Sequence, residues 1–322
     1  MKGKTIIALF LVLSFGVLIA EILYFPSPQT IISSGFGEFR PSSSAGLMPH
    51  FHLGVDFPTY GREGVEIKAI SDGYVYKIEI DEDSIYGYTV YLKNRDFISL
   101  YAHLSTFGER LKPIAESLKR EFPNQRVEVT FPEGEIFVRA GEIVGYSGRT
   151  GDVLAPHCHL ELRDLENKTA LNPIPILNAE RPDDLEVVID EVRIDGEVYP
   201  ATSGVIPFKS DIPKIEVSAY LTYGTTVINP YEVTMSIDGR QVYKIAFDSI
   251  KLSEFTEAYE VYGKGSTYRK YWFKMYSNEP LSVIKTNAWG DIPRLADRVT
   301  VEVTVKSFWD DVKKITFELV RR

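Results

Sequence analysis

Short runs of β-branched and aromatic residues recur along most of the chain, and turn-forming residues separate them. In the second half of the chain, Asp195-Gly196 and Asp238-Gly239 each lie between runs that alternate apolar and polar residues. Such a dipeptide between alternating runs is a strong signal for a β-hairpin. Runs of this kind, bounded by glycine, are typical of antiparallel strands. The sequence therefore predicts a mainly β protein.

The chain is expected to contain two parts. Its 322 residues suggest about two domains, and Pro173, Pro175 and a polar stretch at 178–184 mark the boundary. We predict an N-terminal half over residues 26–178, built as an antiparallel β-sheet. For the C-terminal half, residues 183–322, the short alternating strands predict an immunoglobulin-like β-sandwich.

One segment of the N-terminal half has the spacing of a helix. Leu111, Ile114 and Leu118 recur at intervals of three and four residues, which place them on one helix face. Pro123 ends the pattern. We predict a helical insertion at about 108–135.

The N-terminus has the pattern of an export signal. Two lysines precede an apolar run at residues 5–20, and the apolar character resumes at 22–25. A basic region followed by an apolar one is typical of a secretory signal, although the first run is shorter than the ~20 residues that span a bilayer. We predict that residues 1–25 are a signal peptide or an N-terminal membrane anchor, with anchoring through residues 5–25. The protein is then exported to the cell envelope: the periplasm, the outer face of the inner membrane, or the medium as a secreted protein.

The net charge argues against a nucleic-acid binder, and the cysteine count excludes a protein with an intrachain disulfide bond. The 36 Lys and Arg against 45 Asp and Glu give a net charge of −9, and nucleic-acid binders usually carry a basic patch instead. We therefore expect no nucleic-acid partner. A single cysteine, Cys158, excludes an intrachain disulfide bond.

All five histidines lie within residues 50–159, which is a narrow part of the chain. They are His50, His52, His103, His157 and His159. Clustered histidines with carboxylates nearby have the composition of a metal site.

The segment HCHLELR, residues 157–163, reads as a strand. Because side chains alternate across a strand, one face carries His157, His159, Glu161 and Arg163. Cys158 lies on the opposite, apolar face. We therefore expect two imidazoles to project into one space, while Cys158 packs in the core and acts neither as a ligand nor as a nucleophile.

His52 and Asp56 lie four residues apart in HLGVD. In an extended strand, four steps span about 13 Å, whereas ligands of one zinc each lie about 2 Å from it. The chain must therefore bend between them, and Gly54 permits a bend. A third ligand from the strand at 157–159 would complete a three-residue site with an open position, which is the coordination of a catalytic zinc.

His103 ends another strand-like run, FISLYAHLS. By alternation, Tyr101 and His103 share a face. Spacing alone leaves two roles open for His103, a metal ligand or a group that handles protons.

Three segments, in this order, resemble the lysostaphin-like, LytM-type zinc endopeptidases of bacterial cell walls. These are FHLGVDF (51–57), LYAHLS (100–105) and GYSGRTGDVLAPHCHLELR (145–163). The resemblance extends over about residues 30–177. It implies an antiparallel sheet groove of the LytM, or duplicated-hybrid-motif, type that holds one zinc ion per chain.

The resemblance also implies roles for individual residues. Its metal ligands match His52, Asp56 and His159, and its two catalytic histidines match His103 and His157. Three further polar residues of these segments either orient the metal ligands or have a purely structural role, and both interpretations stay open. They are Tyr101, Glu161 and Arg163. His50 has no counterpart, and we expect it in a solvent-exposed loop.

The residues themselves predict an exported zinc hydrolase, and the resemblance implies an endopeptidase that acts on peptidoglycan cross-links or stems. Zinc lowers the pKa of a bound water toward about 7, and two histidines would share the roles of general base and oxyanion stabiliser. The alternative is a catalytically weak regulatory or wall-binding module of the same fold. Three questions stay open: which bond is cleaved, which of the two histidines is the general base, and what the C-terminal half binds.

Overall fold

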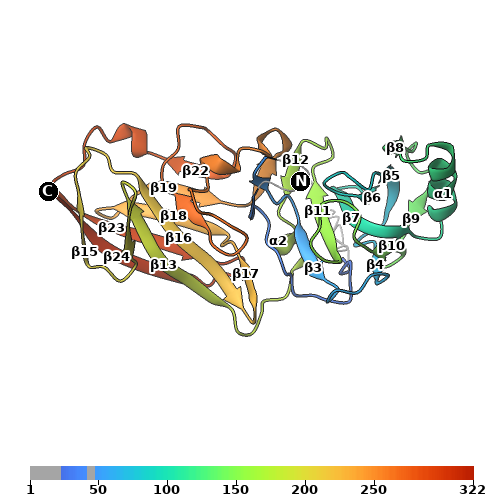
Figure 1. Cartoon of the computed structure of the whole chain (residues 1–322), viewed down its shortest axis with the longest axis horizontal. Helices are drawn as coiled ribbons and strands as arrows, with labels where there is room; N and C mark the ends of the chain where they lie inside the picture. Colours follow the sequence, from blue (N-terminus) through green and yellow to red (C-terminus); the bar gives the residue numbers. More distant parts are fainter. Residues whose placement is uncertain (1–22, 42–47) are drawn as a thin grey trace, which may run out of the picture.

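The computed structural model describes residues 23–41 and 48–322, so most of the predicted signal or anchor lies outside the described residues. The two halves lie end to end, with the N-terminal half at the right of Figure 1 and the C-terminal half at the left. Strands dominate both halves, and the prediction of a mainly β fold is confirmed.

One large antiparallel sheet forms the N-terminal half. Its central strands run in the order β12-β11-β7-β6-β5-β8, and β3, β4, β9 and β10 pair along its edges. The strands of this half are β1 (Phe39–Arg40), β2 (His50–Phe51), β3 (Val55–Pro58), β4 (Glu66–Lys68), β5 (Gly73–Ile80), β6 (Tyr88–Lys93), β7 (Ile98–Phe107), β8 (Val127–Thr130), β9 (Phe137–Val138), β10 (Ile143–Ser147), β11 (His157–Arg163) and β12 (Thr169–Leu171). β1 and β2 pair separately.

The predicted insertion contains a helix and also a strand. Helix α1 (Lys112–Glu121) buries Ala115, next to Leu111, which is also buried. β8 follows the helix and pairs with β5, an addition that the sequence pattern did not predict. α1 lies at the far right end of the molecule in Figure 1, away from β3 and β11.

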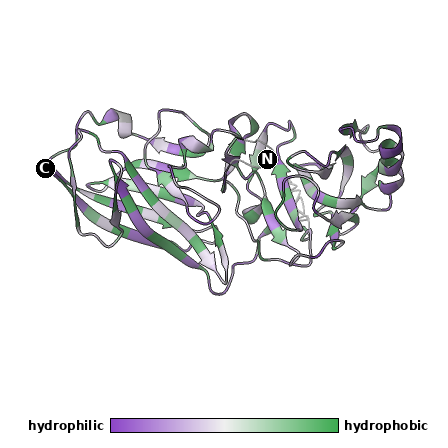
Figure 2. Cartoon of the chain, in the orientation of Figure 1, coloured by the Kyte–Doolittle hydropathy of each residue, from purple (hydrophilic) through white to green (hydrophobic). Residues whose placement is uncertain are grey.

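The C-terminal half contains two sheets. The first has the order β14-β13-β16-β17, with β21 beside β16, and the second has the order β15-β24-β23-β18-β19-β22. The strands are β13 (Glu186–Ile194), β14 (Glu197–Pro200), β15 (Val205–Phe208), β16 (Ile215–Tyr223), β17 (Thr226–Ile228), β18 (Glu232–Ile237), β19 (Arg240–Ala246), β20 (Ser249–Lys251), β21 (Trp272–Lys274), β22 (Ile284–Asn287), β23 (Arg298–Lys306) and β24 (Val312–Arg321). Hydrophobic and hydrophilic residues alternate along these strands in Figure 2.

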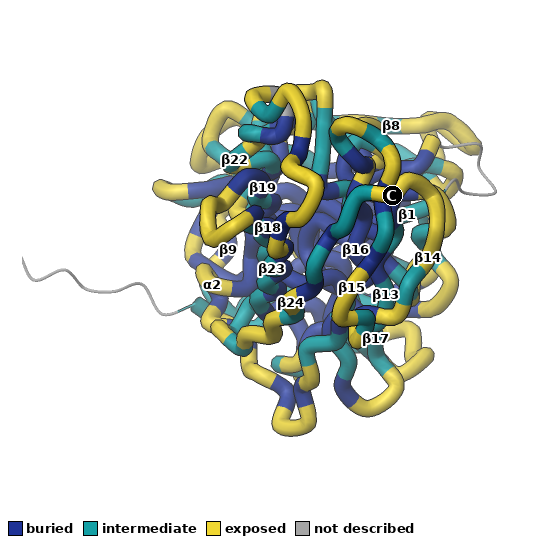
Figure 3. Tube along the Cα trace, turned by 90° about the vertical axis from the view of Figure 1, so that its left-hand side faces the viewer, coloured by how far each residue is buried: buried dark blue, intermediate teal, exposed yellow. Residues whose placement is uncertain are grey.

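This alternation explains which side chains are buried within the C-terminal half. Along β23, for example, Val299, Val301, Val303 and Val305 are buried while the intervening residues are more exposed. In the end view of Figure 3, buried segments fill the interior and exposed loops surround them. β15 and β24 pair in parallel. The immunoglobulin-like assignment stays a prediction.

The two halves are joined by more than the connecting chain. After the short helix α2 (Pro173–Leu177) the chain enters the C-terminal half, yet β20 of that half pairs with β12 and extends the N-terminal sheet. The indole of Trp309 donates a hydrogen bond to the Ala179 carbonyl, 2.8 Å away. Buried residues of both halves form one continuous hydrophobic cluster. The domain limits 26–178 and 183–322 stay predictions, and the structure shows extensive contact across them.

The first described residues pack on the N-terminal half. The Tyr24 amide donates to the Ile70 carbonyl at 2.8 Å, and the ring of Phe25 meets that of Phe57 edge-on at 6.0 Å between centroids. Within the described ranges, we find no helix with the length and apolar character needed to span a membrane.

Candidate metal centre and catalytic groups

The pairing of β3 with β11 places the predicted ligands opposite each other. In this register Asp56 faces His159, while Phe57 faces Cys158. Residues directly opposite in an antiparallel pair share a face of the sheet. Asp56 and His159 therefore lie on the groove face, and Cys158 is fully buried on the other face, as the alternation of HCHLELR predicts.

Gly54 lets the two strands approach closely. A Cβ atom at this position would lie 2.4 Å from the Leu160 carbonyl oxygen and 2.9 Å from Cε1 of His159. The expected bend between His52 and Asp56 is present, because the two side chains meet. The glycine is required there for its small size.

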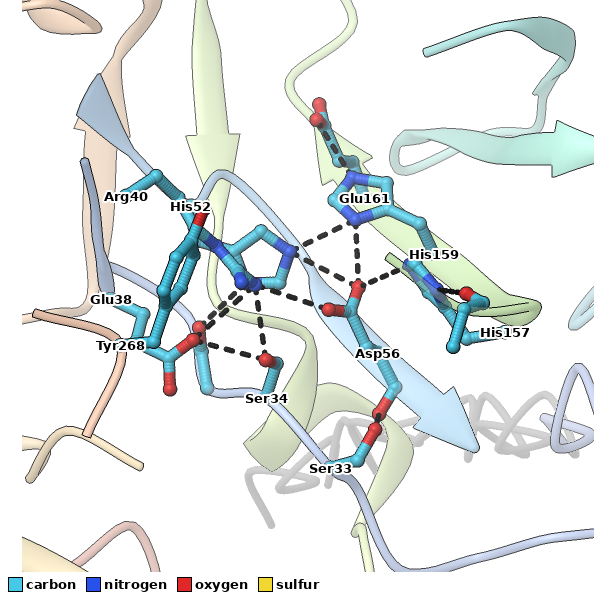
Figure 4. Close-up of polar contacts among 12 residues, drawn as sticks. Ser33, Ser34, Glu38, Arg40, His52, Asp56, His157, His159, Glu161 and Tyr268 are labelled. Carbon is cyan, nitrogen blue, oxygen red and sulfur yellow. Dashed lines mark hydrogen bonds and ion pairs between the residues drawn. The ribbon is translucent and has the colours of Figure 1, made fainter. Parts of the chain in front are cut away.

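Three side-chain atoms converge at the centre of Figure 4. The Nε2 atom of His52 lies 3.1 Å from Oδ1 of Asp56 and 2.9 Å from Nδ1 of His159. Nδ1 of His159 lies 2.9 Å from the same Asp56 oxygen. Ligands about 2.0–2.1 Å from a tetrahedral zinc are about 3.3 Å apart, so the three atoms are already close to zinc-binding spacing.

The tautomers of the two histidines suit a cation. Nδ1–H of His52 donates to the Gly35 carbonyl at 2.8 Å, and Nε2–H of His159 donates to Oε1 of Glu161 at 3.1 Å. When both rings are neutral, each has one N–H, and the two remaining lone pairs point toward the Asp56 carboxylate, where a cation would bind. This donor set fits zinc, whose histidine ligands almost always donate their other N–H to an oxygen.

The electrostatics of these residues support the same conclusion. Burial lowers the pKa of His52 to about 4. Burial also acts to lower the pKa of His159, but hydrogen bonds to Asp56 and Glu161 outweigh it and raise that pKa to about 9. The carboxylates thus retain one positive charge at the place where a metal ion would supply it.

Glu161 and Arg163 form a buried pair behind His159. Arg163 donates through Nε to Oε2 of Glu161 at 2.8 Å, and its Nη2 reaches the Tyr86 hydroxyl at 3.2 Å. Burial acts to raise the pKa of Glu161, and the guanidinium lowers it below its usual range. The pair holds the Glu161 carboxylate ionised and oriented toward the His159 ring.

Tyr101 and His103 lie on opposite faces of β7, so the prediction that they share a face is wrong. His103 has a left-handed φ of 59°, and the register of β7 against β6 shifts between Tyr101 and Leu104. This irregularity turns His103 into the groove. The Tyr101 hydroxyl accepts a hydrogen bond from the Ile70 amide in the core, away from the ligands.

His103 and His157 face each other across the groove. Their ring centroids are 4.9 Å apart. Nδ1–H of His103 donates to the Thr150 carbonyl at 3.0 Å, and Nδ1–H of His157 donates to the Ala155 carbonyl at 2.8 Å. Nε2 of each ring therefore carries the lone pair when the ring is neutral and is an N–H donor when the ring is protonated. Nε2 of His157 lies 3.3 Å from Oδ1 of Asp56, next to the candidate metal position.

Comparisons with known proteins agree with this geometry. Lysostaphin of Staphylococcus staphylolyticus is 30% identical over 151 residues, which are 45% of this chain and 25% of lysostaphin. The glycyl-glycine endopeptidase ALE-1 of Staphylococcus capitis is 30% identical over 139 residues, 40% of this chain and 29% of that protein. The DD-carboxypeptidase/endopeptidase Mpg of Neisseria meningitidis is 29% identical over 154 residues, 47% of this chain and 28% of Mpg.

The N-terminal half is similar to the lysostaphin-like, LytM-type metallopeptidases. The matched part spans only about a quarter of each relative. No family model matches the chain. The solved catalytic domain of lysostaphin from Staphylococcus simulans is 27% identical, with a TM-score of 0.30, over 45% of this chain and 89% of that one.

A cavity of about 590 Å³ opens above the candidate metal centre of the N-terminal half. His52, Asp56, His103, His157 and His159 all line it. Among the described residues that line the cavity, none belongs to the insertion at 108–135.

The described structure corrects the expectation for His50. Its side chain is buried, its ring lies 4.6 Å from that of Phe255 in the C-terminal half, and Nδ1–H donates to the Met48 carbonyl at 2.9 Å. His50 thus belongs to the contact between the halves, because β2 is covered by the C-terminal half.

Arg40 is a site residue that the sequence analysis missed. Its Nη2 lies 3.1 Å from Oδ2 of Asp56, the oxygen that faces away from the histidines, and 3.3 Å from Oε2 of Glu38. Burial raises the pKa of Glu38 to about 7. Arg40 lies within SSGFGEFR (33–40), just before the first motif, but only the folded chain pairs it with Asp56.

We expect Arg40→Met to lower zinc affinity by roughly 10- to 100-fold, the usual loss when a partner of a metal ligand is removed. The substitution keeps the length of the side chain but leaves Oδ2 of Asp56 without its donor. Competition with a chromogenic chelator measures the affinity. Arg240→Met, at an exposed position of β19, is the matched control. Equal zinc affinity in the two variants would contradict the role given to Arg40.

Proposed function

We propose that the chain is an exported, zinc-dependent endopeptidase that hydrolyses peptide bonds in the cross-links or stems of peptidoglycan. One observation carries the proposal: three ligand atoms converge within hydrogen-bond distance of one another, and two further imidazoles face the same cavity. The relatives support it, since two of them are named as endopeptidases.

His52, Asp56 and His159 would hold the zinc ion. When bound, zinc polarises a carbonyl and lowers the pKa of water, so that a strong nucleophile is available at neutral pH. The three buried ligands line the cavity, so they would hold the ion where a peptide can approach it.

His103 and His157 would move the protons. Nε2 of one ring accepts a proton from the attacking water, and the imidazolium then donates a proton to the leaving amine. Nε2–H of the other ring donates a hydrogen bond to the oxyanion of the tetrahedral intermediate. Burial holds the pKa of His103 well below its usual value, so this ring is neutral and its Nε2 can accept a proton.

The location follows from the sequence and from the relatives. The apolar run within residues 5–20 supports export, and enzymes that act on a cell wall work outside the cytoplasm. A cleaved signal and a retained anchor through residues 5–25 are the two forms of this proposal. A soluble product of mature length in the periplasm would indicate cleavage.

Activity should depend on both zinc and peptidoglycan. Purified, zinc-loaded protein is expected to release new muropeptides from isolated peptidoglycan, and their masses identify the bond that is cleaved. Chelation should abolish the release and added zinc should restore it. Binding to peptidoglycan without any change of mass would instead support a regulatory or wall-binding module. The complete ligand set argues against that alternative.

A further inference from the structure

The cavity at the metal centre continues into a second hollow. This hollow has a volume of about 560 Å³ and reaches onto the C-terminal half. The residues that line both spaces are Ser33, Arg40, Leu154 and Tyr268. Of these, Tyr268 belongs to the C-terminal half, and Arg40 lies over its ring at 5.8 Å from the centroid. The C-terminal half thus contributes a side chain at the junction of the two spaces.

A tight hairpin presents this side chain to the groove. The Thr267 amide donates to the Lys270 carbonyl at 2.8 Å, which closes the turn that carries Tyr268 and Arg269. The hydroxyl of the buried Tyr271 lies 2.7 Å from the Tyr268 carbonyl and 2.8 Å from Oε1 of Glu38. The hairpin is therefore attached to the N-terminal half next to the metal centre.

Arg269 adds an available positive charge to the second hollow. Its Nη2 donates to the Thr225 carbonyl, and no carboxylate in the described part of the chain forms an ion pair with it. Thr225, Thr226 and Thr267 line the same space. A guanidinium binds a carboxylate through two parallel N–H donors, and hydroxyl groups can donate to or accept from a peptide backbone.

We propose that this second hollow is a substrate subsite, in which Arg269 binds a carboxylate of the peptide on one side of the scissile bond and Tyr268 packs against the peptide. The inference rests on the proposed peptidase function and names the part of the substrate that the C-terminal half recognises. It gives that half a role in the choice of substrate.

The test compares one soluble stem peptide of peptidoglycan in two forms, with free carboxylates and with the carboxylates converted to amides. With zinc-loaded full-length protein, Arg269→Gln is expected to raise KM for the acid form by roughly 10- to 100-fold, the loss expected for a hydrogen bond to a charged group. The kcat and the zinc content should stay unchanged. For the amidated form, wild type and variant should have the same KM.

Arg240→Gln is the control, because Arg240 is exposed on the same half and lines neither space. An unchanged KM in Arg269→Gln, or an equal rise in Arg240→Gln, would overturn the subsite. If the wild type cleaves neither these peptides nor isolated peptidoglycan, the proposed function fails, and calorimetric binding of the same two peptides then tests the hollow separately. Weaker binding of the acid form alone in Arg269→Gln supports the subsite, and equal binding refutes it.

Discussion

Alanine at His159 is expected to abolish zinc binding and activity together, whereas alanine at His157 leaves zinc in place and lowers turnover by roughly 10²–10⁴-fold. The two residues lie on one face of β11, yet they differ in their contacts. Nδ1 of His159 lies within 2.9 Å of both other ligand atoms. His157 belongs instead to a second group of possible ligand atoms, with His103 and His159, and the resemblance assigns His103 and His157 to catalysis.

Two measurements separate these outcomes. Elemental analysis of purified variants should find about one zinc per chain in wild type and His157→Ala, and little in His159→Ala, as expected for one three-ligand site. Excess zinc should partly restore activity to His159→Ala alone. Zinc loss in His157→Ala together with full zinc in His159→Ala would reverse the assignment.

Two further variants extend this comparison. Cys158→Leu should keep zinc and turnover, because Cys158 is fully buried opposite Phe57 on the apolar face. At His103, asparagine is the better replacement, since its backbone has a φ of 59° and asparagine tolerates this region. His103→Asn should retain zinc and lose turnover, as His157→Ala does.

Gly54→Ala is expected to damage the metal centre without changing any ligand. The added Cβ would lie 2.4 Å from the Leu160 carbonyl oxygen, so β3 and β11 must move apart. Such overpacking typically costs about 1–3 kcal/mol of folding free energy. The separation also pulls Asp56 away from His159, so zinc affinity should fall more than stability alone would explain.

Urea unfolding and zinc titration on the same samples check this prediction. Gly204→Ala is the matched control, because a Cβ at Gly204 has nothing within 4 Å and its φ is not left-handed. That variant should match wild type in both measurements. Wild-type zinc affinity in Gly54→Ala would show that the contact between the strands does not determine the ligand geometry.

Much of the metal centre can be predicted from the sequence, because strand alternation is a local property of the backbone. The order of residues in HCHLELR places His157, His159 and Glu161 on one face whichever strand lies beside them. The need for a bend between His52 and Asp56 likewise follows from the length of an extended strand. The confirmed β class depends on the same two-residue period.

Strand alternation did not predict the side of β7 on which the His103 side chain lies. A shift in register depends on how β7 pairs with β6, and the left-handed turn at this residue reverses the face predicted for its side chain. The helix of the insertion was predictable from the spacing of its apolar residues. Strand β8 was not, because it is a strand only through its pairing with β5.

Contacts between distant segments were decided by the tertiary structure alone. Arg40 meets Asp56, His50 meets Phe255, and Tyr268 lies at the edge of the cavity only because the C-terminal half packs on the loops of the N-terminal half. Local backbone geometry alone placed His157 and His159 on one face and required a bend between His52 and Asp56, whereas the choice of ligands came from the resemblance. The folded chain determined what surrounds the ligands, because packing between the halves brings together residues that no local period connects.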